Sequence, residues 1–97
     1  MTITDIKVRS LINYGRLRAI ISITLDDLIA IHDIKVVQGD GKLFVSMPSR
    51  KDENGAFRDI VHPISAEGRK QIEDMIIDAY HRAVLNAEID EEAFRKI

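Results

Sequence analysis

Residues 43–64, LFVSMPSRKDENGAFRDIVHPI, predict a strand, a tight reversal and the approach to a helix. From Leu43 to Met47 successive side chains alternate between two faces, which is typical of a β-strand. Pro48 ends this strand because proline lacks the amide proton that a sheet ladder needs. Asn54-Gly55 accepts the positive φ angles of a tight turn, so we expect Phe57–Val61 to return beside the residues before it. The predicted structure is an exposed β-hairpin arm.

Three cations lie on this predicted arm, Arg50 and Lys51 on its first limb and Arg58 on its second. Such groups on an exposed arm suit contact with phosphates, and a guanidinium fork can also address base edges. The alternative is that they only neutralise the three carboxylates beside them in the sequence, since charge clusters are usually solvated surface. The residues alone favour this second interpretation.

Three more amphipathic strands are predicted upstream of this stretch. Residues 4–12 alternate charged and apolar side chains, and residues 16–25 give the clearest strand signal because apolar residues recur at every second position. Residues 28–37 have mixed faces, so this strand is either covered on both faces or contains a bulge. Short turns join the strands into a four-stranded antiparallel meander: Asn13-Tyr14-Gly15, Asp26-Asp27 and Gly39-Asp40-Gly41.

A single helix is predicted after the arm. Ser65 is a suitable N-cap, and Glu67 places a negative charge in the first turn, where the helix dipole favours it. Apolar residues then recur at helical spacing and predict a stripe that packs across the sheet: Ile72, Met75, Ile76, Ala79, Tyr80, Ala83 and Val84. Beyond them, Asp90-Glu91-Glu92 begins either a short terminal helix or a frayed tail. The fold class is therefore α+β, with one domain over residues 1–85 and a tail or short helix over residues 86–97.

Length and composition are those of one small globular domain. Of 97 residues, 45% are hydrophobic and 31% charged, which supports one modest core and argues against disorder. The chain has no cysteine, so a disulfide framework and a thiolate metal site are excluded. The N-terminal residues lack a signal-peptide pattern, and no apolar run approaches the roughly 20 residues of a membrane helix. We therefore expect a cytoplasmic protein that does not associate with membranes.

The net charge of −2 is unevenly distributed along the chain. Residues 1–70 carry a formal charge of +2, and residues 71–97 carry −4. A local basic surface can attract phosphate on a protein that is acidic as a whole, because the Debye length at physiological salt is only about 8 Å. Binding supported by so little charge should be modest and should weaken steeply as salt is raised.

Two further groups of cations are candidate contact surfaces. Arg69 and Lys70 flank the apolar stripe near the start of the predicted helix, and His81 and Arg82 lie farther along it. Such residues more often only improve solubility. A third patch would form if neighbouring strands turned four cations to the same side: Lys7, Arg9, Arg16 and Arg18. Their faces depend on the strand register.

Catalytic and metal-binding interpretations find little support. His32 and Asp33 are neighbours, and neighbouring strand residues point to opposite faces unless a bulge intervenes. Asp26-Asp27 is more simply a turn, and His62 before a proline is a packed or hydrogen-bonded hinge. The three histidines lack metal-motif spacing, and no nucleophile-elbow or phosphate-loop pattern is present. We predict no catalytic residue, metal, cofactor or small-molecule substrate.

Strand edges and a small core favour association with a second copy. One helix covers one face of a four-stranded sheet and leaves the edges open. We predict a homodimer through a sheet edge or through the strand over residues 28–37.

Base stacking is not expected to dominate, because the aromatic residues are scattered and Phe44 or Phe57 is assigned to the core rather than to a stacking platform.

Four segments appear along the chain in a recognisable order: Ser22–Asp26 (SITLD), Ile31–Ile34 (IHDI), Leu43–Arg50 (LFVSMPSR) and Phe57–Ile64 (FRDIVHPI). With their surroundings, from about Thr4 to about Tyr80, they resemble the bacterial stage V sporulation protein G (SpoVG, septation protein) family. The tail lies outside the resemblance. The resemblance implies a small cytoplasmic regulator of septation and sporulation that binds DNA or RNA, as a homodimer.

The resemblance also gives the arm cations a functional interpretation. It favours Arg50, Lys51 and Arg58 as nucleic-acid contacts over the charge-neutralising alternative, with Arg69 and Lys70 as additional contacts. The other hypothesis is a protein-interaction module of cell division, in which the arm and the acidic tail meet a protein partner and nucleic acid has no role. The salt dependence of binding separates the two hypotheses.

Overall fold

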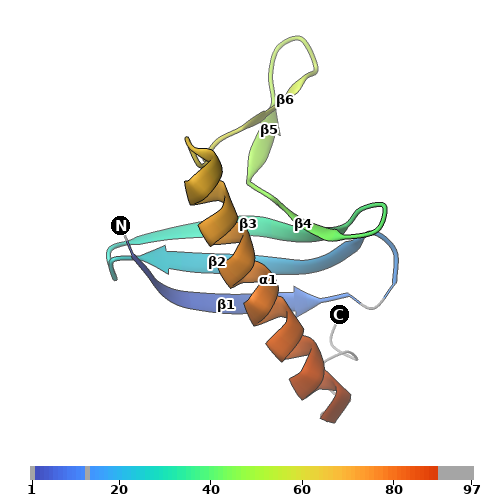
Figure 1. Ribbon diagram of the computed structural model, residues 1–97. Helices are drawn as coiled ribbons and strands as arrows, with labels where there is room; N and C mark the ends of the chain where they lie inside the picture. Colours follow the sequence, from blue (N-terminus) through green and yellow to red (C-terminus); the bar gives the residue numbers. More distant parts are fainter. Residues whose placement is uncertain (1, 13, 90–97) are drawn as a thin grey trace.

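The chain forms a four-stranded sheet, a separate two-stranded arm and one long helix (Figure 1). The computed structural model describes residues 2–12 and 14–89. The antiparallel sheet follows chain order: β1 (Ile3–Leu11), β2 (Leu17–Leu25), β3 (Ile29–Gln38) and β4 (Leu43–Ser46). The arm and the helix follow: β5 (Ser49–Lys51), β6 (Phe57–Asp59) and α1 (Ala66–Ile89). This arrangement confirms the predicted α+β class.

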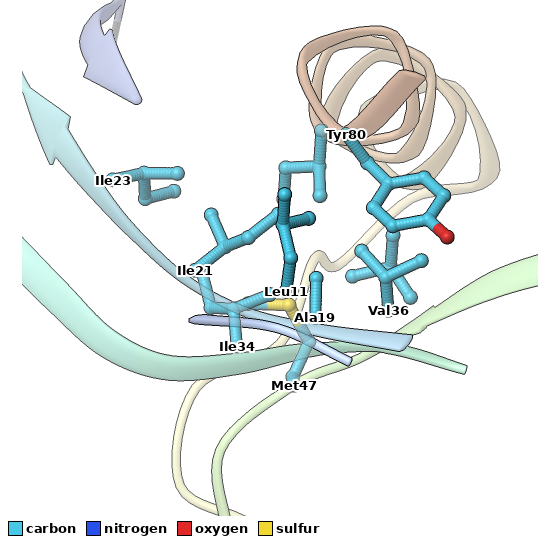
Figure 2. Packing of buried hydrophobic residues seen from close by; sticks show 10 residues of the cluster. Leu11, Ala19, Ile21, Ile23, Ile34, Val36, Met47 and Tyr80 are labelled. Carbon is cyan, nitrogen blue, oxygen red and sulfur yellow. The ribbon is translucent and has the colours of Figure 1, made fainter. Parts of the chain in front are cut away.

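The core lies between α1 and one face of the sheet. Tyr80 projects from the helix toward the aliphatic side chains of the sheet (Figure 2), and Ile76 belongs to the same buried cluster. Alternation along the strands places the other buried apolar residues on this face: Leu11, Ala19, Ile21, Ile23, Ile34, Val36 and Val45, joined by Met47 after β4. Full burial of one such aliphatic side chain contributes about 1.5–3 kcal/mol, so this layer holds the helix on the sheet.

The turn between β2 and β3 is built from two aspartates, as predicted. Asp26 and Asp27 have φ angles of 52° and 56°, and the Leu28 N–H donates to the Leu25 carbonyl at 2.9 Å. A turn with two positive φ angles matches the right-handed twist of the strands it joins. The Asp26 carboxylate also accepts a 2.8 Å hydrogen bond from the Thr2 N–H, which ties the start of β1 to this turn.

Four register shifts interrupt the sheet, two between β1 and β2 and two between β2 and β3. In β3, the register passes from Ile34 opposite Ile21 to Ile31 opposite Ile23, so His32 and Asp33 together oppose Ser22. Asp33 has a φ angle of 62°, a conformation that non-glycine residues rarely adopt. This confirms the bulge alternative for the strand with mixed faces and explains why its alternation is irregular.

In β1, the register passes from Val8 opposite Ile21 to Ser10 opposite Ile20, which leaves Arg9 as the extra residue. Within the described residues, three strand segments of the four-stranded sheet have an edge without a partner strand: β1, β4 and the first part of β3. β1 is an edge strand along its whole length. β3 pairs with β4 only from Lys35 to Gln38, so residues 29–34 have no further partner strand within the described part of the chain.

α1 follows the arm after a short connection and begins with a capped first turn. The Ser65 hydroxyl accepts a 3.0 Å hydrogen bond from the Gly68 N–H, which confirms Ser65 as the N-cap. α1 continues to Ile89, so the predicted boundary between residues 85 and 86 falls inside the helix, and the division of the chain at that point stays a prediction. The alternative of a short helix or frayed tail concerns residues 90–97, which lie outside the described residues.

Candidate nucleic-acid interface

The β5–β6 arm brings the three predicted arm cations onto two short paired strands. Arg50 lies opposite Arg58 and Lys51 lies opposite Phe57, so the two arginines share one face of the arm. Figure 1 shows the arm extending away from the four-stranded sheet. Like charges directly opposite each other destabilise a strand pair, so this register favours a negatively charged partner.

Asp52 organises the tip of the arm. One oxygen of its carboxylate accepts hydrogen bonds from the N–H groups of Asn54 at 2.9 Å and Ala56 at 3.0 Å. The other accepts one from Arg58 Nε at 2.7 Å. The Arg58 guanidinium, followed by these backbone N–H groups, lowers the pKa of Asp52 below its ordinary value. Asp52 is absent from the predicted contacts, although an aspartate two residues before Asn-Gly is a signal of a side-chain-capped turn.

Arg50 and Lys51 are the arm cations without a carboxylate partner. Among the side chains that the structure describes, neither forms an ion pair within 4.0 Å, whereas Arg58 is held by Asp52. Lys51 Nζ lies 5.7 Å from the centre of the Phe57 ring, within cation–π range. Arg50 and Lys51 therefore keep their charge available to an external partner.

The prediction that Phe44 or Phe57 belongs to the core is wrong. The Phe57 side chain is 73% exposed because the arm stands clear of the sheet and the helix. Phe44 is 40% exposed because it points away from the face that α1 covers, between the buried Val45 and the preceding turn. Phe57 thus presents an aromatic ring beside Lys51 on the arm.

The predicted helix cations are already paired with carboxylates one turn away. Arg69 Nη1 lies 3.6 Å from Glu73 Oε1, and Lys70 Nζ lies 2.8 Å from Asp74 Oδ2. The hydrogen bond and the charge of Asp74 raise the pKa of Lys70. Arg82 is held in the same way by Asp78 at 2.7 Å. The helix surface therefore offers less uncompensated positive charge than the arm, and a role for Arg69 and Lys70 in binding stays a prediction.

The strand register divides the third predicted patch. Lys7 and Arg9 lie on the sheet face opposite α1, because Lys7 pairs with Ser22 and Arg9 Nε donates to the Ser22 hydroxyl at 3.3 Å. Arg16 instead lies 3.3 Å from Asp40, and Arg18 Nη1 donates to the Gly15 carbonyl at 3.2 Å. The structure therefore brings Lys7 and Arg9 together beside Ser22, whereas Arg16 and Arg18 contact Asp40 and Gly15.

An exposed apolar segment connects the arm to α1. Ile60 is 64% exposed, Val61 37% and Ile64 94%. Soluble proteins rarely expose several large apolar residues within one short segment. Where they do, the exposed surface commonly binds a partner. This segment was predicted only as the end of a strand and an approach to the helix.

Comparison with known proteins places this geometry in a family. The SpoVG family model matches residues 1–82, which includes the whole sheet, the arm and most of α1. The chain belongs to the SpoVG family. The resemblance found in the sequence is thereby confirmed, and the final residues lie outside the family match.

Relatives in the SpoVG family extend over most of the chain. A protein of Clostridioides difficile (strain 630) is 50% identical over 92 residues, which are 95% of this chain and all of the relative. One of Acholeplasma laidlawii (strain PG-8A) is 52% identical over 88 residues, or 91% of this chain and 93% of the relative. One of Desulforudis audaxviator (strain MP104C) is 49% identical over 83 residues, or 84% and 94%. All three carry the name "Putative septation protein SpoVG". Within the described residues, no helix combines the length and apolar character needed to cross a membrane.

Proposed function

We propose that this SpoVG family member is a cytoplasmic regulator of the septation and sporulation type that binds DNA or RNA through the β5–β6 arm. The observation that carries the proposal is the register of the arm, in which Arg50 lies directly opposite Arg58 and Lys51 follows on the other face. The arm places cations on both faces, and two of the three have no internal ion pair among the described side chains. No catalytic step, metal or cofactor is part of this proposal.

Electrostatics explains why a polyanion suits this arm. Each phosphate that is neutralised by a lysine or arginine releases condensed counterions, and this release supplies most of the sequence-independent affinity. Asp52 holds Arg58 by its Nε atom at 2.7 Å, so the terminal nitrogens of that guanidinium can still meet a phosphate. The exposed Phe57 ring beside Lys51 adds a surface on which an unpaired base can stack.

A homodimer belongs to the same proposal. The β1 edge and residues 29–34 of β3 are open to strand pairing, and Ile60, Val61 and Ile64 expose apolar surface between the arm and α1. A two-fold dimer brings two arms to one ligand, which raises the effective affinity without any new contact within each arm.

A protein partner is the second candidate, and the apolar segment favours it. Exposed Ile60, Val61 and Ile64 beside a charged arm match an interface with an apolar centre and a polar rim. In that case binding would depend on Ile64 rather than on Arg50, and added salt would weaken it little. Nucleic acid would then have no role.

Retention of labelled nucleic acid separates the candidates. The probes are duplex and single-stranded DNA and RNA, each measured at a low and at a physiological salt concentration. We expect retention that weakens steeply with salt and that falls when Arg50 is replaced by alanine. Lys42→Ala is the matched control, because it removes one exposed charge from the turn before β4. Absence of retention for every probe would reject the proposed function.

A further inference from the structure

We propose that Arg9 and His32, positioned by Ser22 on the sheet face opposite α1, form a second phosphate-binding site that contacts the backbone of a bound nucleic acid. The identity of this ligand rests on the proposed function, whereas the site itself rests on the geometry of the sheet. Its residues lie on β1, β2 and β3 and belong to neither the arm nor the helix.

Two of the bulges bring Arg9 and His32 to the same residue, Ser22. In β1 the extra residue of the bulge is Arg9, and in β3 the two residues opposite Ser22 are His32 and Asp33. In a regular ladder one residue of β1 and one of β3 would lie opposite Ser22. The bulges add Arg9 in β1, beyond the residue that pairs with Ser22, and a second residue in β3 opposite Ser22. Bulges re-aim side chains and are found next to functional sites, and Asp33 holds a φ angle of 62° to make this one.

Ser22 joins the two basic side chains by hydrogen bonds. Its hydroxyl oxygen lies 2.8 Å from His32 Nδ1 and accepts a 3.3 Å hydrogen bond from Arg9 Nε. The Ser22 residue is only 6% exposed, while Arg9 and His32 are exposed. A buried hydroxyl between two exposed basic groups fixes their orientation and leaves their outer nitrogens toward solvent.

The outer nitrogens have the chemistry of a phosphate clamp. Arg9 uses Nε for Ser22, so its two terminal nitrogens remain for a phosphate, which guanidinium groups bind through paired N–H donors. When Ser22 donates to Nδ1 of a neutral imidazole, the ring proton lies on Nε2 and points outward. A protonated imidazole also carries a proton on Nε2. In both states His32 offers a donor to the ligand.

The surrounding charges favour an anion. Lys7 pairs directly with Ser22 on the same face, and Lys35 occupies this face farther along β3, between the buried Ile34 and Val36. The carboxylates nearby are Asp33 in the bulge and Asp5, which pairs with Thr24.

Salt titrations of nucleic-acid binding test the site. Arg9→Ala should reduce the slope of log affinity against log salt by about 1, while Lys42→Ala, with the same change of charge, serves as the control. His32→Gln, which removes the imidazole and its Nε2 donor, should lower the affinity at constant salt. Ser22→Ala should reproduce much of the Arg9→Ala loss, and Ser22→Thr, which restores a hydroxyl, should recover it. Unchanged amide spectra of Ile21 and Val36 would show that the core is intact.

A titration with inorganic pyrophosphate tests the site independently of nucleic acid. The amide resonances of Arg9, Ser22 and His32 should shift in the wild-type protein, and those of Ser22 and His32 should not shift in Arg9→Ala. If the wild type retains no nucleic acid but these resonances shift, the proposed function fails and the site stands. The site is rejected if pyrophosphate moves none of them, or if Arg9→Ala and His32→Gln bind nucleic acid with the same salt slope and affinity as Lys42→Ala.

Discussion

Arg50 and Arg58 lie directly opposite each other in the two-stranded β5–β6 sheet, with both guanidinium groups on one face of an exposed arm. A pair of like charges in this position is unfavourable within the protein alone. The Asp52 carboxylate relieves part of the repulsion by holding Arg58 at 2.7 Å, and Arg50 keeps no such partner among the described side chains. Arg50 is therefore an exposed cation on the arm that no described carboxylate compensates.

The shape of the arm should depend on pH through Asp52. Its pKa in the folded protein is lowered, chiefly by Arg58, so its ionisation stabilises the arm above the unfolded pKa and this contribution is lost as the pH falls through the folded pKa. The amide resonances of Asn54 and Ala56 should move together at a pH below the ordinary pKa of an aspartate. Arg58→Gln should shift that midpoint to higher pH. An unchanged midpoint in this variant would mean that Arg58 does not set the pKa of Asp52.

The N-cap of α1 should be required for full stability. Ser65→Ala removes the hydroxyl that accepts the Gly68 N–H at 3.0 Å, and loss of such a cap costs about 0.5–2 kcal/mol. Urea unfolding measures the change in the free energy of unfolding. Ser65→Asp, which can also accept this hydrogen bond, should lose much less, and equal losses in the two variants would argue against a capping role.

Ile76 should be the most sensitive position on the helix. It is fully buried at 0% exposure against the sheet, so Ile76→Ala should lower the free energy of unfolding by about 2–5 kcal/mol. Met75 is its neighbour on α1 and is 43% exposed, which makes Met75→Ala a matched control with a smaller expected loss. Similar losses at the two positions would contradict the assignment of the core face.

Self-association should depend on the exposed segment between the arm and α1. Ile64 is 94% exposed, so Ile64→Lys should weaken a dimer while leaving the melting of the monomer unchanged. Sedimentation velocity over a range of protein concentrations measures the change. A single species of 11.0 kDa for the wild type at micromolar concentration would reject the dimer.

Much of the fold follows from local signals in the sequence. Alternation along residues 16–25 predicts β2 because its buried face needs an apolar residue at every second position. Ser65 predicts the helix start, and Asn54-Gly55 predicts the reversal, in which Gly55 has a φ angle of 84°. These features depend on a few neighbouring residues, so they can be predicted without knowledge of the tertiary structure.

The details of the candidate site depend on register and on side-chain pairing, which local patterns do not determine. The spacing of four residues from Arg69 to Glu73 and from Lys70 to Asp74 is visible in the sequence and does indicate ion pairs on a helix. The convergence of Arg9 and His32 on Ser22 is different, because it requires one bulge in each of two strands. Alternation alone does not predict where those bulges lie.

The most direct measurement is the salt dependence of nucleic-acid affinity for the wild type and for a variant with Arg50→Ala and Lys51→Ala. If both cations neutralise phosphates, the slope of log affinity against log salt should fall by about 2, and affinity at low salt should fall with it. The same slope and affinity in both proteins would contradict the central claim that the arm binds a polyanion.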